Sequence, residues 1–290
     1  MSKEIVVGFD GSSGSSNAVQ WAASEAQARG ARLRIVSCFS VPVAADGVYG
    51  LAAADACEGS KSAEEQKLAA LGTQIAELHP ALEIVTEATS GSPGHVLVDR
   101  VDADDMIVVG ASAHHHAAAF WLGSTPRHVV RHSPCPVVVI RGAAASSRPT
   151  RLVVGVDGSP TSEEAVSWAG DEADRLGVNL VLVHAWSYPY TPVDAASSQA
   201  HDLTKIDAAC LLEAAVESAR ERFGAGVSGR LIETGPVAAL LQSTRQGDLL
   251  VVGSRGRGAL AASLLGSTVN SVLDESEVPV VVMPHSRHEG

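Results

Sequence analysis

The sequence predicts two α/β domains in tandem, each built on a doubly wound, five-stranded parallel sheet. An internal repeat gives the domain count: residues 5–40 align without a gap with 152–187, and residues 106–141 align with 249–284. In each half, short β-branched runs alternate with longer segments of helical period, which is typical of strands joined by crossover helices. Several runs are apolar on consecutive residues, as expected for parallel strands that helices cover on both faces.

Ten strands are expected, five in each half. The linker is expected at residues 143–150, where small residues and a proline replace any apolar period. The predicted domains are therefore 1–142 and 151–290. The expected strands lie near residues 5–10, 32–39, 82–88, 105–110 and 136–141 in the first half, and near 151–157, 179–186, 228–233, 248–253 and 279–283 in the second.

Helix starts and stops agree with this assignment. Ser162 precedes two glutamates and an apolar segment, so we expect its hydroxyl to cap the helix that follows. Gly30 and Gly177 follow the first helix of each half and are expected to end it. Residues 40–61 and 187–199 are rich in alanine, glycine, proline and serine, and are expected to be mobile loops.

The composition argues against several classes of partner. The formal net charge is −12 and acidic residues outnumber basic ones in both halves, which disfavours nucleic acid. No apolar run approaches the ~20 residues that cross a bilayer, so no membrane partner is expected. The four cysteines lack disulfide or metal spacing, and the chain starts without an apolar signal segment. We therefore expect a reduced, cytoplasmic protein with no metal site built from its own side chains.

Residues with chemical potential follow strands that meet at one edge of each predicted sheet. In open α/β sheets, ligands bind beyond the carboxyl ends of the strands, near the point where strand order reverses. The first strand of each half is followed there by Asp-Gly-Ser, beginning at Asp10 and at Asp157. The fourth strand of the second half is followed by residues 253–258, whose glycines and two arginines suit an anion.

The glycine-rich loop matches neither of the common nucleotide motifs. The P-loop pattern is absent from the sequence. Residues 256–261 imitate the dinucleotide fingerprint only weakly, because the match follows the fourth strand and no helix starts at once. Binding of NAD or FAD is therefore not expected.

A different pattern, G-x2-G-x9-G-[ST], is complete in the second half at Gly253, Gly256, Gly266 and Ser267. With the VGxDGS opening, the VVGSRGRG loop, LLGST and the closing VPVVVM strand, it resembles the universal stress protein family. The resemblance covers nearly the whole chain as two tandem copies. It implies the family's five-stranded parallel sheet between helices, an adenine-nucleotide α-hydrolase-like fold, and many members with this glycine pattern bind ATP.

The resemblance implies an ATP site in the second half, with Mg accompanying the nucleotide. Asp157 and the backbone near Gly155 would lie beside adenine and ribose, and the backbone of Ala185 would meet the adenine. Glycines let amides approach phosphate oxygens, while a hydroxyl and a helix N-terminus add donors. The implied ATP-binding residues, including two arginines for charge-assisted contacts, are Gly155, Asp157, Gly158, Ser159, Ala185, Gly253, Ser254, Arg255, Gly256, Arg257, Gly258, Gly266, Ser267 and Thr268.

The first half departs from the family pattern. Ala113 stands where the second glycine belongs, and the loop has no arginine. If that position needs a positive φ, alanine costs about 1 kcal/mol there. We therefore expect a weaker N-terminal site, made of Gly8, Asp10, Gly11, Gly110, Gly123, Ser124 and Thr125.

Other conspicuous residues are expected to be structural. Three consecutive histidines at 114–116 cannot all face one ion from a loop, so a solvated loop is the simpler interpretation. Trp21 and Trp168 lie at helical spacing from alanines and are expected in the core. Asp105 and Asp248 precede the fourth strands at the end opposite the glycine loop, as turn or cap residues. Cys135, between two prolines, is expected to be a small buried residue without a redox role.

The function that the resemblance implies is a nucleotide-dependent regulatory protein of stress adaptation, in which ATP would change the surface offered to an unidentified protein partner. No catalytic residue is expected, because no base is identifiable. One alternative is a slow ATPase or phosphotransfer enzyme that uses Asp157 with Arg255 or Arg257. Another is an assembly module without nucleotide, whose closing strands, 136–140 and 279–283, pair with each other. We expect these strands to form an internal pseudo-dimer and to support a homodimer.

Overall fold

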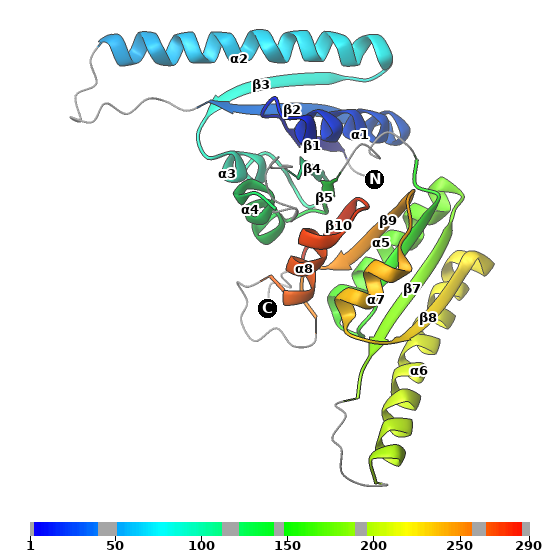
Figure 1. Cartoon of the computed structure of the whole chain (residues 1–290). Coiled ribbons are helices and arrows are strands. Elements are labelled where there is room, and N and C mark those ends of the chain that lie inside the picture. The colour runs from blue at the N-terminus through cyan, green and yellow to red at the C-terminus, as the bar shows by residue number, and fades with distance from the viewer. Residues whose placement is uncertain are drawn as a thin grey trace. The chain divides into compact units, whose positions relative to one another are not determined.

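A computed structural model describes residues 3–39, 51–111, 122–141, 148–188, 196–256 and 265–285. The chain divides into two compact units, Met1–Ser146 and Ser147–Gly290, and each is an α/β domain with five parallel strands. Unit 1 contains β1 (Glu4–Gly8), α1 (Ser13–Arg29), β2 (Arg32–Phe39), α2 (Leu51–Leu78), β3 (Ile84–Ser90), α3 (Pro93–Val98), β4 (Met106–Gly110), α4 (Ser124–His132) and β5 (Val137–Ile140), as Figure 1 shows.

Unit 2 repeats this order of elements. It contains β6 (Arg151–Gly155), α5 (Pro160–Leu176), β7 (Asn179–Trp186), α6 (Ala196–Phe223), the 3-10 turn η2 (Gly224–Gly226), β8 (Val227–Glu233), α7 (Pro236–Ser243), β9 (Asp248–Gly253), α8 (Ser267–Glu275) and β10 (Val280–Met283). Strand order is β3-β2-β1-β4-β5 in unit 1 and β10-β9-β6-β7-β8 in unit 2. The predicted fold class is therefore confirmed.

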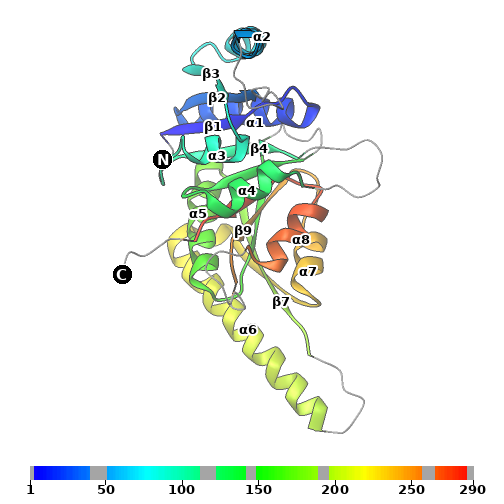
Figure 2. The same ribbon diagram turned by 90° about the vertical axis from the view of Figure 1, so that its left-hand side faces the viewer.

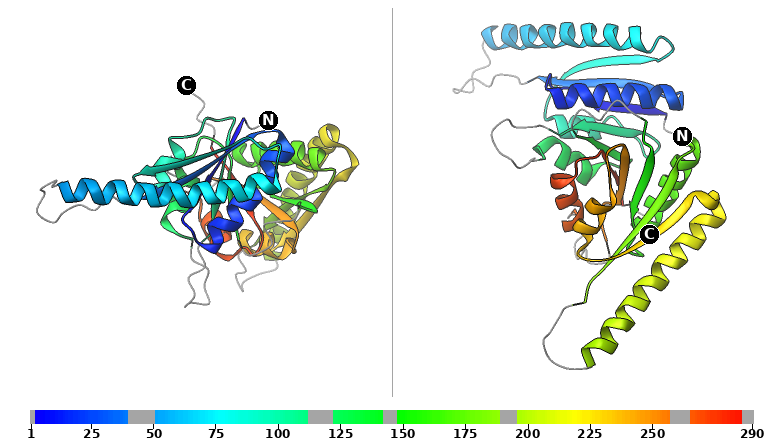
Figure 3. Two further views of the ribbon diagram at one scale, coloured as in Figure 1. Left: turned by 90° about the horizontal axis from the view of Figure 1, so that it is seen from above. Right: turned by 45° about the vertical axis from the view of Figure 1, so that its right-hand side comes forward.

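Strand order reverses at the same point in both units, which is where open α/β sheets bind ligands. The first strand of each unit pairs with the second on one side and the fourth on the other, so strand order reverses there. Helices cover both faces of the sheet. On one face, the Ser37 hydroxyl of β2 donates a hydrogen bond to Glu64 of α2. On the other face, Gly8 of the neighbouring β1 lies against Leu97 of α3. The long helices α2 and α6 run along the edge strands β3 and β8 (Figure 3).

The strands begin and end within two residues of the predicted bounds, and continuous apolar runs mark the buried inner strands most clearly. The predicted loops were wrong in part. Helix α2 already begins at Leu51 and α6 at Ala196, since alanine-rich segments favour helix. Residues 40–50 and 189–195 of the two predicted loops lie outside the described residues. No helix in the described part of the chain is long and apolar enough to span a membrane.

The helix stops are confirmed, whereas the predicted cap of α5 is wrong. Gly30 and Gly177 end α1 and α5 with left-handed φ values of 64° and 66°. The N-cap of α5 is Ser159, whose hydroxyl accepts a hydrogen bond from the Ser162 amide at 3.3 Å. Pro160 follows at the first helical position, where its missing N–H costs nothing, so the cap lies three residues before the predicted one.

Ser159→Ala is expected to lower the free energy of unfolding of unit 2 by about 1 kcal/mol, because it removes the cap of α5. Urea denaturation without nucleotide measures this change. Ser218→Ala, at an exposed position inside α6, is the matched control and should leave stability within about 0.5 kcal/mol of wild type. Equal values for the two variants would contradict the role of Ser159.

Candidate functional site

Unit 2 has a cavity of about 540 Å³, including its open mouth, at the carboxyl ends of β6, β7 and β9. Helices α7 and α8, which lie side by side in Figure 2, contribute to its walls. The lining residues are Gly155, Val156, Asp157, Ser162, Val183, His184, Ala185, Pro236, Ala239, Leu240, Val252, Gly253, Arg255 and Thr268.

One part of the cavity is an apolar slot. Val183 and Ala185 alternate along β7 and therefore share a face of the sheet. Ala239 and Leu240 of α7 line the slot as well. A Cβ added to Gly155 would lie 3.1 Å from Leu240 Cδ2, so glycine at this strand end makes room for Leu240. Such a slot suits a flat, largely apolar group such as a nucleobase.

A fixed carboxylate lies at the polar end of the cavity. Asp157 Oδ1 accepts a hydrogen bond from the Ser159 amide at 2.9 Å, which closes a tight turn. Gly158 occupies the middle of this turn with φ +72°, a value that favours glycine. A Cβ on Gly256 would overlap Asp157 Oδ2. The φ of Gly256 is not in the left-handed region, so the carboxylate, not the backbone angle, explains the second glycine of the motif.

The loop after β9 and the start of α8 present amide donors. Gly266 is the N-cap of α8, and no side chain caps this helix. The Gly266 amide donates to Ser254 O at 3.1 Å, which ties the two ends of the loop together. Uncapped first-turn amides and the helix dipole favour an anion at this position. The Ser254 hydroxyl is buried and, among the described residues, has no hydrogen-bond partner.

Most of the predicted residues gather around this cavity. Gly155, Asp157, Ala185, Gly253, Arg255 and Thr268 line it. Gly158, Ser159, Ser254, Gly256, Gly266 and Ser267 adjoin it through the turn, the loop and the start of α8. Arg257 and Gly258 lie outside the described residues. Five lining residues were not predicted from the sequence: Val183, Pro236, Ala239, Leu240 and Val252. Only Val183 could have been found, because it alternates with Ala185 along the same strand.

Unit 1 repeats the carboxylate turn. The Ser12 amide donates to Asp10 Oδ1 at 2.9 Å, and Gly11 has φ +80°. Burial raises the pKa of Asp10, but hydrogen bonds from Ser12 and Ser15 outweigh it, so the pKa lies below the ordinary 3.8. A Cβ on Gly8 would meet Leu97, as at the equivalent glycine of unit 2.

The start of α4 also repeats its counterpart. Gly123 is the N-cap, and Ser124 and Thr125 form an uncapped first turn after it. Gly110 ends β4, as predicted. Residues 112–121, which include Ala113 and the predicted solvated histidines, lie outside the described residues.

The slot itself differs between the units. The repeat puts Cys38 of unit 1 at the position of Ala185, and Val96 at the position of Ala239. Both unit 1 side chains are larger, so less room remains for a flat ligand. Burial raises the pKa of the Cys38 thiol, the Glu87 carboxylate raises it further, and Arg100 opposes them.

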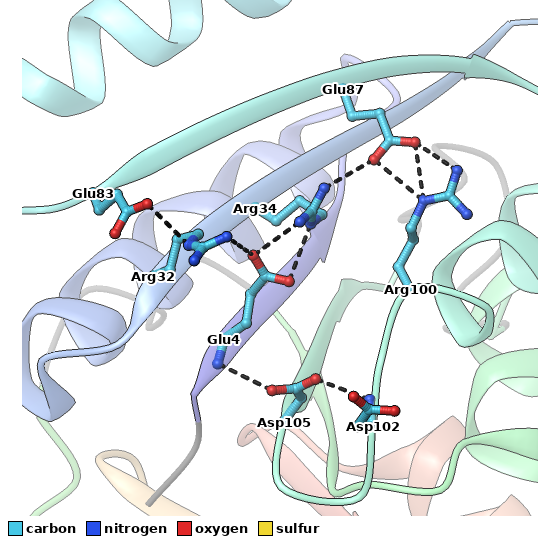
Figure 4. Close-up of polar contacts among 8 residues, drawn as sticks. All are labelled: Glu4, Arg32, Arg34, Glu83, Glu87, Arg100, Asp102 and Asp105. Atoms are coloured by element: carbon cyan, nitrogen blue, oxygen red, sulfur yellow. Dashed lines mark hydrogen bonds and ion pairs between the residues drawn. The ribbon is translucent and has the colours of Figure 1, made fainter.

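A row of charged side chains flanks this part of unit 1, as Figure 4 shows. The charged row consists of Glu4, Arg34, Glu87 and Arg100. Arg34 donates to Glu4 Oε2 at 3.1 Å and to Glu87 Oε2 at 3.2 Å, and Arg100 Nη2 donates to Glu87 Oε1 at 2.7 Å. The Arg100 hydrogen bond holds the pKa of Glu87 below its ordinary 4.5, with burial opposing and Arg34 assisting.

Unit 2 has no equivalent of the charged row. Arg34 shares its face of β2 with Cys38, whereas the corresponding face of β7 is apolar next to the slot. The unit 2 residues at the positions of Glu4, Arg34, Glu87 and Arg100 are Arg151, Val181, Arg230 and Ser243. The two units therefore offer different surfaces beside equivalent strand ends.

Most of the residues that were expected to be structural have structural contacts or are buried. Asp105 accepts from the Glu4 and Asp102 amides, and Asp248 pairs with Arg151, so both organise the turn before the fourth strand. Trp21 is buried as predicted, whereas Trp168 is only half-buried. Cys135 is buried, and burial raises its pKa to about 11. No group of three or more metal-ligating side chains within the described residues could hold a metal ion.

Comparison with known proteins decides the family. A family model described as "Universal stress protein family" matches residues 1–141 and again 149–284. The chain belongs to the universal stress protein family. It is 34% identical over 298 residues to a universal stress protein of Mycobacterium tuberculosis H37Rv, with 97% of each chain covered. It is 33% identical over 288 residues to one of Mycolicibacterium smegmatis, with 96% of each covered.

The family's fold is also evident from a solved structure. The crystal structure of a universal stress protein from Archaeoglobus fulgidus aligns with a TM-score of 0.73, covering 99% of this chain and 100% of that one. The sequence identity is 18%, so the likeness concerns the fold. The predicted resemblance is thus confirmed for the family and for its two tandem copies.

Proposed function

We propose that unit 2 binds ATP with Mg, and that occupancy of this site regulates a cytoplasmic role in stress adaptation. The observation that carries the proposal is the cavity that joins an apolar slot, the Asp157 carboxylate and the N-terminus of α8. Adenine suits the slot beside Ala185. Asp157 would accept hydrogen bonds from the ribose hydroxyls. The α8 amides and Arg255 would hold the phosphates.

Mg would arrive with the phosphates in this proposal. The ion commonly keeps several water ligands and is held through one or two carboxylates and substrate phosphates, without a dedicated protein cage. The buried Ser254 hydroxyl, which lacks a described partner, supports a polar ligand near the glycine loop. Arg257, Gly258 and Ser267 belong to the proposed phosphate-binding set by their motif positions.

Unit 1 is proposed to bind ATP weakly or not at all. Cys38 and Val96 narrow its slot, and the loop after β4 has no arginine. Its Asp10 turn and the start of α4 retain the remaining parts of the site. The asymmetry between the units would make unit 2 the nucleotide sensor of the chain.

The proposed regulation includes an assembly step. ATP would order the loops around the site and change the surface that a protein partner meets. The closing strands β5 and β10 are short, apolar and buried. Pairing between such strands would produce an internal pseudo-dimer or a homodimer. Light scattering of the full chain tests whether the homodimer forms.

Slow ATP hydrolysis is the second candidate, because Asp157 and Arg255 line one cavity. Phosphoryl transfer also needs a metal and a group that orients the nucleophile. Asp157→Ala distinguishes the two candidates. Loss of turnover with ATP affinity retained would favour the enzyme, whereas absence of turnover in wild type would favour the binding protein.

Mg-ATP is expected to raise the melting temperature of the full chain. At about 100 times its Kd, a ligand that binds only the folded state stabilises it by about 2.7 kcal/mol. The matched control is Ala185→Cys with Ala239→Val, which gives unit 2 the slot residues of unit 1 and should reduce the shift. Absence of any shift at millimolar Mg-ATP would contradict the proposed function.

A further inference from the structure

Three histidines of unit 1 stack between two helices. The His95 ring of α3 lies 4.0 Å from the His128 ring of α4, centroid to centroid, with an interplanar angle of 38°. His132, one turn further along α4, also stacks on His128, with ring centroids 4.2 Å apart and an interplanar angle of 29°. His128 is half-buried between two exposed rings. We name His95, His128 and His132 the histidine stack.

The backbone of α3 makes room for the histidine stack. A Cβ on Gly94 would lie 2.8 to 2.9 Å from the Cβ, Cγ and Cδ2 atoms of His128, which is closer than packed atoms approach. Glycine at this position therefore lets α4 carry an imidazole against α3. Unit 2 pairs α7 with α8 in the same place without any histidine, since the equivalents of Gly94, His95, His128 and His132 are Val237, Ala238, Ser271 and Glu275.

The charges around His128 favour its neutral form. Burial lowers its pKa below the ordinary 6.5, and the neighbouring His132, His95 and Arg131 lower it further, while Asp99 opposes them. The strands β4 and β5 behind α4 carry no titratable side chain. Strands β1 and β2 lie behind α3, and their charged residues are Glu4, Arg32 and Arg34. All three form ion pairs, either with one another or with Glu83 and Glu87. The remaining titratable group on these strands is the Cys38 thiol.

We propose that the α3–α4 contact of unit 1 is a pH-sensitive joint, which neutral imidazoles close and which loosens when the histidine stack takes up protons. A histidine whose pKa is lowered by folding stabilises the folded contact above the ordinary pKa of 6.5, and this stability is lost as the pH falls below it. Helix α4 begins at Ser124, in the first turn that follows Gly123. Acidification therefore acts on the helix that begins at the glycine motif of unit 1, whereas α7 and α8 of unit 2 carry no histidine.

Hydrogen exchange of the full chain, measured by mass spectrometry at about pH 7.5 and about pH 5.5 and corrected for the intrinsic rate, tests the joint. Protection of residues 93–99 and 124–132 is expected to fall about two- to fivefold at the lower pH. The reason is that protonated imidazoles at neighbouring helical positions repel one another. Residues 236–243 and 267–275 of unit 2 are the internal control and should show no comparable loss. Equal changes in the two units, or no change in unit 1, would overturn the proposal.

Two variants connect the effect to the imidazoles. His128→Ser introduces the residue that unit 2 carries at this position, and it should abolish the loss of protection at the lower pH. His95→Ala removes an exposed ring and should reduce the loss even if His128→Ser fails to fold at about pH 7.5. If either folded variant lost as much protection at the lower pH as the wild type does, the proposal would be overturned.

Discussion

Gly256→Ala is expected to weaken Mg-ATP binding by about tenfold or more. The added Cβ would overlap Asp157 Oδ2, so the carboxylate must turn away from its present position. That movement takes Oδ2, a charged acceptor, away from the position proposed to contact the ribose. A hydrogen bond to a charged group contributes about 1.5–3 kcal/mol, which corresponds to a tenfold change or more in Kd. Equilibrium dialysis with labelled ATP measures the affinity.

Gly59→Ala is the matched control for this variant. Gly59 lies inside α2 of unit 1, and nothing stands within 4 Å of an added Cβ. ATP affinity should stay at the wild-type value. The reciprocal change, Ala113→Gly, is not expected to create a strong site in unit 1, because Cys38, Val96 and the absence of an arginine remain. Wild-type affinity in Gly256→Ala would contradict the role assigned to the second glycine.

Asp248→Ala is expected to destabilise unit 2 by about 3–5 kcal/mol, the cost of breaking a buried ion pair by removing one partner. The Asp248 side chain is fully buried and pairs with Arg151. It also accepts a hydrogen bond from the Arg245 amide at 3.0 Å, so its removal leaves both a charge and a backbone donor without this acceptor. Urea denaturation measures the free energy of unfolding.

The position of Asp248 makes the result specific. It starts β9 at the end opposite the cavity, so the folded variant should bind ATP with wild-type affinity. Asp104→Ala in unit 1 is the control, because Asp104 is exposed and its contact with Lys3 is a surface ion pair. This substitution should lower the free energy of unfolding by less than about 1 kcal/mol. A loss below about 1 kcal/mol for Asp248→Ala would contradict the buried ion pair.

The strands and the edge of the sheet that carries the site were predictable from the sequence. Runs such as 249–252 are apolar on every residue because helices cover both faces of the strand. The repeat then placed Asp157 and Gly253 at neighbouring strand ends, where the structure has them. Local chemistry was harder to assign. The cap of α5 is Ser159 because Pro160 fits the first helical position, whereas the glutamates after Ser162 had predicted Ser162.

Features that depend on three-dimensional neighbours were not predictable. The charged row joins β1, β2 and β3 with Arg100, which lies two residues after the end of α3, and its residues become neighbours only through strand register. The histidine stack combines two helices and depends on Gly94 for its space. The sequence left open whether the second glycine of the motif needs a positive φ. Gly256 does not have one, and its missing Cβ leaves room for the Asp157 carboxylate.

Isothermal titration of the full chain with Mg-ATP tests the central claim of an asymmetric pair most directly. We predict a stoichiometry of about one, with Gly256→Ala removing most of the heat at the same concentrations. A stoichiometry of zero would contradict the nucleotide site, and two sites of equal affinity would contradict the asymmetry between unit 1 and unit 2.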